Sequence, residues 1–350
     1  MKRLHCALLL CLFAVPCMAQ SHDPFDGQIP GQETWFSTFS IIAFDPATNQ
    51  LGVAVESRAF GAGAIVPWVE SGVGAVASQA AANRTYGPKA MALLKQGLTP
   101  EEVIKRITDD DPGRDTRQVA VIDTKGRMAS YTGKRVIDRD NDPTDHVHFG
   151  DYAGAITIPG KNYSVQGNTL VSADVLKATA QTYEETKGTM AERLLAAIEA
   201  GQSKGGDSRG MQAGGIIVVQ PVKDMAASLQ ADRVVDIRVD DAENPFKEMR
   251  RILNVRLSGD HVQKADQLAK DGKLSEAIAE DKVALEMNPK NEQINYKLAV
   301  FYARSGEYLN SLQALTAALQ RQKKLKMDIA EEPAFNKMKE MPEFRRLIGQ

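Results

Sequence analysis

Paired strand patterns alternate with paired helix patterns up to about Asp240, and this order restricts the fold more than any other feature of the chain. "TFSIIAF" and "LGVAVES" flank the turn "DPATNQ", and "RQVAVID" and "RMASYTG" flank "TKG". Such segments predict β-hairpins rather than βαβ crossovers. We therefore predict an α+β domain over residues 38–240, with antiparallel sheets and helix pairs packed on them.

Helix start signals lie between the hairpins. Thr99, Pro100 and Glu102 combine an N-cap, a proline at the first helical position and a capping box. Thr189 and Glu192 form a second capping box. Each of these helices is preceded in the sequence by another predicted helix, so the helices come in two pairs. The preceding helices are "YGPKAMALLKQG" and "SADVLKATAQTYEET".

After Asn244 the pattern changes to continuous helix signals, which predict a second, all-α domain over residues 245–350. The spacing from Gly272 in "KDGKLSEAI" to Gly306 in "RSGEYLNSL" equals the tetratricopeptide period of about 34 residues. The region resembles one full tetratricopeptide unit with partial flanking units; a generic helical hairpin is the alternative. We expect this surface to bind a protein partner or a second copy of the chain.

Residues 1–19 are typical of a secretory signal peptide. Lys2 and Arg3 precede the apolar "ALLLCLFAVP", which is too short to span a bilayer, and "CMA" ends at Ala19. Residues 20–37 then form a loose leader. We predict a periplasmic or secreted protein without a membrane span. The chain's three cysteines all fall in the signal, so the mature protein is expected to contain no disulfide: Cys6, Cys11 and Cys17.

Composition and motifs narrow the possible functions. The net charge is −2, which gives no sign of a surface for nucleic acid. The sequence contains no phosphate-binding glycine loop, no G-x-S-x-G elbow and no H-E-x-x-H zinc motif. We therefore predict no cofactor and a small molecule as the substrate, whose identity the sequence does not reveal.

Thr38 and Ser57 are candidate catalytic residues at the ends of the first hairpin. Thr38 opens its strand as an exposed hydroxyl residue, and symmetric pairing about the six-residue turn would place it opposite Ser57. A slip of one residue would point the two to opposite faces. A terminal α-amine, with a pKa of about 8, can take the proton of a Thr hydroxyl and make it a nucleophile. The alternative is that Thr is simply a good strand residue.

Two polar segments supply further candidates. Gln79 and Asn83 follow a strand in "SQAAANRTYG", where we predict substrate contacts; Gln79 could instead cap the next helix. Asp207 and Arg209 lie in "GGDSRG" between a helix and a strand. In the functional interpretation Asp207 orients the catalytic site and Arg209 binds a substrate carboxylate. In the structural interpretation the two form a surface pair in a turn.

Arg117 opens another predicted strand and is a candidate for substrate binding. The alternative is an ion pair with one of three nearby acids, Asp110, Asp111 or Asp115.

The stretch from residue 134 to 163 is polar and is expected to be irregular. Asp138, Asp140 and Asp142 alternate as in a calcium loop, but a proline and a phenylalanine replace the Gly and Glu that such a loop requires. His146 and His148 could hold zinc, yet no third ligand is evident. We therefore predict a solvated loop and no metal site.

Several quoted motifs occur in one order along the chain. "TFSIIAFDPATNQLGVAVES", "GAIVPWVESGVGAVASQA", "RQVAVID", "QGN" and "ERLLAAIEAGQSKGGDSRG" together resemble domain of unknown function 1028, a bacterial family. The resemblance implies the N-terminal-nucleophile (Ntn) hydrolase fold, with four layers αββα. It also adds Asn168 of "QGN" to the candidate substrate-binding residues.

In many similar sequences the Thr of "TFSI" directly follows the initiator Met. In this chain residues 20–37 separate the expected signal cut from Thr38, so a free amine requires a second cut. Two hypotheses follow. The chain is either an Ntn-type hydrolase acting on an amide in a small polar substrate of the cell envelope, or a non-catalytic scaffold that recruits a partner through its helical repeats.

Overall fold

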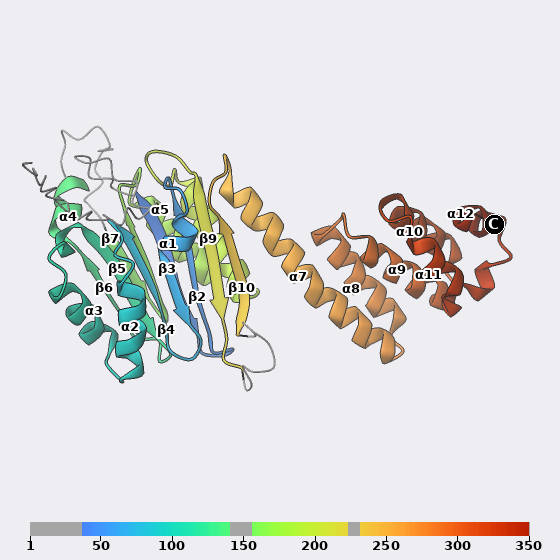
Figure 1. Ribbon diagram of the computed structural model, residues 1–350, viewed down its shortest axis with the longest axis horizontal. Helices are drawn as coiled ribbons and strands as arrows, with labels where there is room; N and C mark the ends of the chain where they lie inside the picture. The colour runs from blue at the N-terminus through green and yellow to red at the C-terminus, as the bar shows by residue number, and fades with distance from the viewer. Residues whose placement is uncertain (1–36, 141–155, 223–231, 350) are drawn as a thin grey trace, which may run out of the picture. The chain divides into compact units, whose positions relative to one another are not determined.

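The computed structural model describes residues 37–140, 156–222 and 232–349 (Figure 1). The predicted signal peptide, the leader up to residue 36 and the two histidines of the polar loop, 146 and 148, lie outside these ranges.

Six strands form one antiparallel sheet in the order β10-β9-β2-β1-β8-β7. The first hairpin therefore occupies the centre of this sheet. The strands are β1 (Thr38–Asp45), β2 (Gln50–Ser57), β7 (Ile156–Gly160), β8 (Tyr163–Asn168), β9 (Ala213–Val219) and β10 (Arg233–Val239).

Four strands form a second antiparallel sheet in chain order. They are β3 (Pro67–Glu70), β4 (Gly74–Ala80), β5 (Arg117–Asp123) and β6 (Met128–Thr132). The predicted α+β class with antiparallel sheets is confirmed.

Three apolar cores hold the sheets and their helices together. Between the sheets, Ile42, Val53 and Ile217 pack against Ala77 and Ile122. On its outer face the four-stranded sheet packs against α2 (Tyr86–Lys95) and α3 (Pro100–Asp109). The outer face of the six-stranded sheet packs against α5 (Asp174–Glu185) and α6 (Met190–Ser203).

Local sequence signals set several of these boundaries. Both predicted capping boxes are present, with Thr99 and Thr189 accepting from the backbone N–H of Glu102 and Glu192. The symmetric hairpin is confirmed as well, because Thr38 pairs with Ser57 across β1 and β2. The six-residue turn therefore fixes which side chains share a face with Thr38.

The prediction of an irregular stretch over residues 134–163 is wrong for its described parts. Residues Lys134–Asp140 form α4, and β7 and β8 form a hairpin. The strand "YSVQGN" escaped detection because its Gln and Asn side chains, although buried, are polar. A short helix at Ala62–Ile65, α1, was also not predicted.

The helix α7 (Pro245–Lys270) contributes to two cores. Phe246, Met249 and Leu253 in its first half belong to the core of the six-stranded sheet. Ala265 and Ala269 in its second half belong to a separate core formed by the later helices. These are α8 (Leu274–Met287), α9 (Glu292–Ser305), α10 (Tyr308–Arg321), α11 (Leu325–Glu331), α12 (Pro342–Ile348) and the 3-10 helix Pro333–Met338.

The two glycines at the repeat spacing both follow a helix and have positive φ. Gly272 has a φ of 79° after α7, and Gly306 has a φ of 85° at the end of α9. Glycine is favoured here because other residues rarely adopt a left-handed backbone. Each glycine thus ends the first helix of a hairpin.

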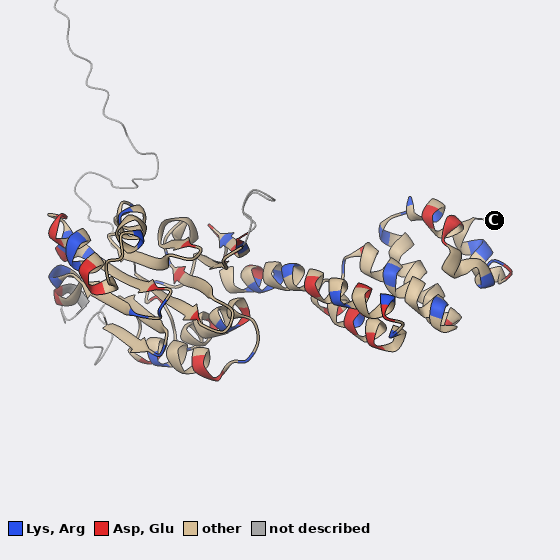
Figure 2. Ribbon diagram, turned by 90° about the horizontal axis from the view of Figure 1, so that it is seen from below, with Lys and Arg blue, Asp and Glu red and all other residues tan. Residues whose placement is uncertain are grey.

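Charged residues lie mostly on helices and loops, where basic and acidic residues are interspersed (Figure 2). Many form pairs three or four residues apart, as Arg256 and Asp260 do on α7. Within the described ranges, no helix has both the length and the apolarity needed to span a bilayer.

Candidate active site

Thr38 and Ser57 lie side by side at one end of the two central strands of the six-stranded sheet, where β1 begins and β2 ends. Their hydroxyl oxygens are 2.9 Å apart. The expectation that Thr38 is exposed is wrong, since only 1% of its surface is accessible. The chain continues upstream into Ser37, which is itself buried and whose hydroxyl contacts the carbonyl oxygens of Asn168 and Thr169.

The carbonyl oxygen of Ser37 accepts two hydrogen bonds. Ser57 Oγ donates at 2.5 Å and Arg209 Nη2 donates at 3.1 Å. A serine hydroxyl has one hydrogen, so Ser57, having given it to Ser37, must accept from Thr38 Oγ1. The peptide bond before Thr38 is therefore polarised at its carbonyl and lies next to the Thr38 hydroxyl.

Asp207 holds Arg209 in place. Arg209 Nε and Nη2 donate to the two carboxylate oxygens at 3.1 and 2.8 Å, which is bidentate pairing. The backbone N–H groups of Arg58 and Arg209 complete the bonding of Asp207. The alternative of a surface pair is wrong for Asp207, because its side chain is fully buried. The backbone of Asp207 forms a β-bridge with Leu170. Among the described residues Asp207 makes no hydrogen bond to Thr38 or Ser57, and Arg209 lies between Asp207 and the Ser37 carbonyl oxygen.

Gln79 joins Thr38 to a layer of buried amides between the sheets. Its Nε2 donates to the carbonyl oxygen of Thr38 at 3.1 Å and to Gln118 Oε1 at 2.8 Å. Asn168 Nδ2 donates to the same Gln118 oxygen at 3.0 Å, and Asn168 is also the ladder partner of Thr38 across β1 and β8. Gln79 does not cap the next helix, whose N-cap is Thr85.

Three further buried polar side chains of this layer were not predicted from the sequence: Ser40, Gln118 and Gln166. Alternation along β1 and β5 could have found Ser40 and Gln118, because they have the same parity as Ile42 and Ile122, which face the other sheet. On β8 the residues of that parity are all polar, so alternation gave no signal for Gln166.

Asn83 and Arg117 belong to a different network, centred on Asp111. Asn83 Nδ2, Tyr86 Oη and Arg117 Nε all donate to Asp111 Oδ2, at 3.0, 2.8 and 3.0 Å. Burial alone would raise the pKa of Asp111, but these bonds and that from the backbone of Gly113 outweigh it and lower the pKa to about 2. Of the three acids considered for Arg117, Asp111 is therefore its partner.

Glu56 is a buried acid that the sequence analysis also missed. It is fully inaccessible, and neither carboxylate oxygen has a hydrogen-bond partner among the described residues. Burial, reinforced by the negative charge of Asp207 and opposed by Arg209, raises the pKa of Glu56 well above its usual value. Glu56 pairs with Phe39 on β1 and so faces the helices, away from Thr38.

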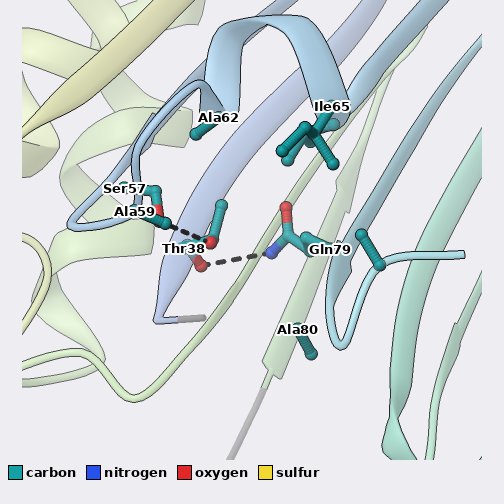
Figure 3. A pocket seen from close by; sticks show the side chains of 9 residues that line it. Thr38, Ser57, Ala59, Ala62, Ile65, Gln79 and Ala80 are labelled. Carbon is teal, nitrogen blue, oxygen red and sulfur yellow. Dashed lines mark hydrogen bonds between the residues drawn. The ribbon is translucent and has the colours of Figure 1, made fainter. Parts of the chain in front are cut away.

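A small cavity lies beside Thr38 (Figure 3). Its volume is about 10 Å³, roughly the space that one water molecule needs. Ala62 and Ile65 of α1 lie on one side of it, with Thr38 and Gln79 on the other. The remaining lining residues are Ser57, Ala59, Val66, Ala80 and Ala82.

Comparison with known families decides where the chain belongs. The sequence model of the family described as "Family of unknown function (DUF1028)" matches residues 38–249, which is more than half of the chain. The chain belongs to this family. The DUF1028 match begins at Thr38 and ends within α7, so it contains the candidate site except Ser37, and part of the helix that completes the first core.

A solved member of DUF1028 has a related structure. The crystal structure of protein SPO2555 from Silicibacter pomeroyi is 26% identical in sequence, with a TM-score of 0.52. The alignment covers 62% of this chain and 84% of that one. No curated protein matches the sequence.

The described part of this DUF1028 chain contains no group of three or more His, Cys, Asp or Glu side chains that could hold a metal ion. The candidate metal loop with His146 and His148 lies outside the described residues. Asp138, at its start, is paired with Lys134 on α4.

Proposed function

We propose that the chain is an Ntn-type hydrolase, with Thr38 as the nucleophile after the Ser37–Thr38 bond is cut. The substrate would be an amide, or a related carbonyl compound, of a small polar molecule in the cell envelope. The observation that carries this proposal is the Ser37 carbonyl oxygen, which two donors hold beside the Thr38 hydroxyl.

The same arrangement supports a self-cleavage step. Thr38 Oγ1 attacks the carbonyl carbon of Ser37, and the negative charge forms on the oxygen held by Ser57 and Arg209. The C–N bond breaks as the amide nitrogen takes up the proton lost by the Thr38 hydroxyl, which leaves Ser37 as an ester on Thr38 Oγ1 and a free α-amine on Thr38. Water then hydrolyses the ester, giving a carboxylate on Ser37 and restoring the hydroxyl of Thr38.

After the cut, the two donors no longer hold the Ser37 carbonyl and are available to a substrate. The α-amine of Thr38 takes the hydroxyl proton while Oγ1 attacks the substrate carbonyl. Ser57 and Arg209 stabilise the oxyanion, and the leaving amine takes the proton. Water then hydrolyses the acyl ester and restores the Thr38 hydroxyl. Gln79 Nε2 holds the Thr38 backbone in place by donating to the carbonyl oxygen of Thr38.

The packing of the core supports the Ntn fold as well. Helices α5 and α6, the two sheets, and helices α2 and α3 pack in the order expected for an αββα arrangement. The glycine spacing and paired helices support a tetratricopeptide-like role for the C-terminal region. Residues 1–19 support export to the periplasm or beyond.

Intact mass and N-terminal sequencing of the protein purified from the periplasm test the proposal. We expect a mature chain that starts at Thr38 and forms a covalent adduct with an electrophilic carbonyl probe. Thr38→Ala should abolish both the cut and the adduct, whereas Thr38→Ser should retain them. An active protein that begins at residue 20 and is unaffected by Thr38→Ala would refute the proposal.

The burial of Ser37 and Thr38 favours a second candidate, a non-catalytic scaffold. In the uncut chain both residues are inaccessible and the cavity beside them holds no more than one small molecule of water size. Such a protein would bind a partner through α8–α12. Retention of residues 20–37 in the functional protein would favour this alternative.

A further inference from the structure

The cavity beside Thr38 has two chemically different sides. Thr38, Ser57 and Gln79 supply hydroxyl and amide groups, while every other lining residue is aliphatic: Ala59, Ala62, Ile65, Val66, Ala80 and Ala82. Among the residues that the structure describes, none that lines the cavity is charged. A neutral, apolar group therefore fits against the aliphatic side when its attached carbonyl faces Thr38.

We propose that this cavity is the subsite for the substituent next to the scissile carbonyl, and that it admits an aliphatic group of about methyl size. The substrate would then carry an alanyl-sized acyl group on an otherwise polar small molecule. This inference rests on the proposed function and adds the class of substrate.

The size limit follows from how α1 is fixed. Gly61, just before α1, has a φ of 69°, and its N–H donates to the carbonyl oxygen of Asp240 at 3.0 Å. Gly63 packs directly on β9, where a Cβ atom would lie 2.5 Å from the carbonyl oxygen of Gly214. Because α1 rests backbone to backbone on the sheet, its residues Ala62 and Ile65 cannot move inward or outward easily.

Ala80 is another residue of the cavity lining, and its backbone has a left-handed conformation. It is the last residue of β4, is fully buried and has a φ of 60°. A left-handed conformation is unfavourable for any residue with a Cβ, and such strain is concentrated at functional sites. The conformation places the Ala80 methyl group at the cavity next to Gln79, where a longer side chain would fill the space.

Two residues of the cavity lining are partly accessible to solvent. Ile65 and Ala82 are the two lining residues that are only half-buried, whereas Ala59, Val66 and Ala80 are buried. A substrate enters between Ile65 and Ala82, which leaves the polar part of the molecule outside and its small acyl substituent against Thr38.

A series of boronic acids tests this on the full processed chain that begins at Thr38. The probes are α-aminoboronic acids with methyl, isopropyl, isobutyl or benzyl side chains, and adduct formation at Thr38 is followed by intact mass. We expect the methyl compound to react at least tenfold faster than the isobutyl compound, since a few methylene groups in a packed apolar site discriminate by that much or more.

Ile65→Ala should remove this preference by enlarging the cavity. Val73→Ala is the control and should leave the preference unchanged, because Val73 lies just before the first residue of β4 and does not line the cavity. Adducts that form at equal rates for all four probes would overturn the inference while leaving Thr38 as the nucleophile. Absence of an adduct with every probe, or a chain that is never cut before Thr38, would instead overturn the proposed function and with it this inference.

Discussion

The hydroxyl groups of Thr38 and Ser57 lie 2.9 Å apart because their residues are direct partners in the β1–β2 ladder. Ser57 in turn donates to the carbonyl oxygen of Ser37, so one serine connects the candidate nucleophile to the bond that it would cut. This connection makes Ser57 the first residue to test.

Ser57→Ala should slow the cut before Thr38 by about 10²–10³-fold, since it removes one donor to the developing oxyanion. Arg209 would remain as the other donor, so the cut should not stop altogether. The half-time of conversion, measured by intact mass during refolding, checks this expectation. Ser130→Ala on β6, where the serine is exposed, is the matched control, and equal half-times for the two variants would contradict the role of Ser57.

Asp207→Asn should weaken both the fold and the site. The carboxylate is fully buried and receives four hydrogen bonds, and removing its charge leaves Arg209 without its bidentate partner. Loss of such a pair costs about 3 kcal/mol of unfolding free energy. Urea denaturation of the full chain measures this loss. The exposed Asp174→Asn should cost less than about 0.5 kcal/mol, and a similar loss in both variants would argue against a special role for Asp207.

The sequence predicted the elements whose signals are local. The hairpin register followed from a symmetric six-residue turn, and both capping boxes followed from residues within one helical turn. Thr38 and Ser57 came together for the same reason, since their separation in sequence is short. Asp207 and Arg209 could be proposed as a pair because they are two residues apart.

The rest depends on contacts between distant segments. Arg209 reaches the carbonyl oxygen of Ser37 across 172 residues, which no local pattern can reveal. Arg117 had three nearby acids in sequence, and the choice of Asp111 depends on Asn83 and Tyr86, which approach it from another part of the chain. Strand β8 was missed because the buried side chains on one of its faces are polar, and two of them, Gln166 and Asn168, donate hydrogen bonds to the other sheet.

Asp281 should make the helical region less stable as the pH rises. This residue on α8 is inaccessible and its carboxylate oxygens have no hydrogen-bond partner among the described residues. Burial raises its pKa from 3.8 to about 7, with Lys297 opposing and Asp266 adding to the shift. The folded state thus holds a proton that the unfolded state releases, so stability is full below pH 4 and falls until about pH 7.

The size of this effect can be checked with Asp281→Asn. A shift of roughly three units corresponds to about 4 kcal/mol, which the substitution should restore above pH 7 but not near pH 4. Thermal unfolding followed by circular dichroism at pH 4.5 and pH 8 measures the difference. Asp271→Asn, at an exposed position after α7, is the control. A variant that is no more stable than the wild type at pH 8 would contradict the prediction.

The first half of α7 should be indispensable to the sheet domain. Four of its side chains are buried in the core of the six-stranded sheet, and Arg250 pairs with Glu199 of α6. Burial of an apolar side chain contributes about 1.5–3 kcal/mol, so the four together contribute a large part of the roughly 5–15 kcal/mol that stabilises an ordinary domain. The four residues are Phe246, Met249, Leu253 and Leu257.

Two truncations of the chain separate this contribution from that of the later helices. A chain that ends at residue 258 keeps all four side chains and should unfold cooperatively, whereas a chain that ends at residue 244 should be unfolded or aggregated. Within the full chain, Leu253→Ala should cost about 2–5 kcal/mol. Val255→Ala, at an exposed position on the same helix, is its control and should cost little. Equal melting temperatures for the two truncated chains would mean that α7 only connects the sheet domain to the helices that follow.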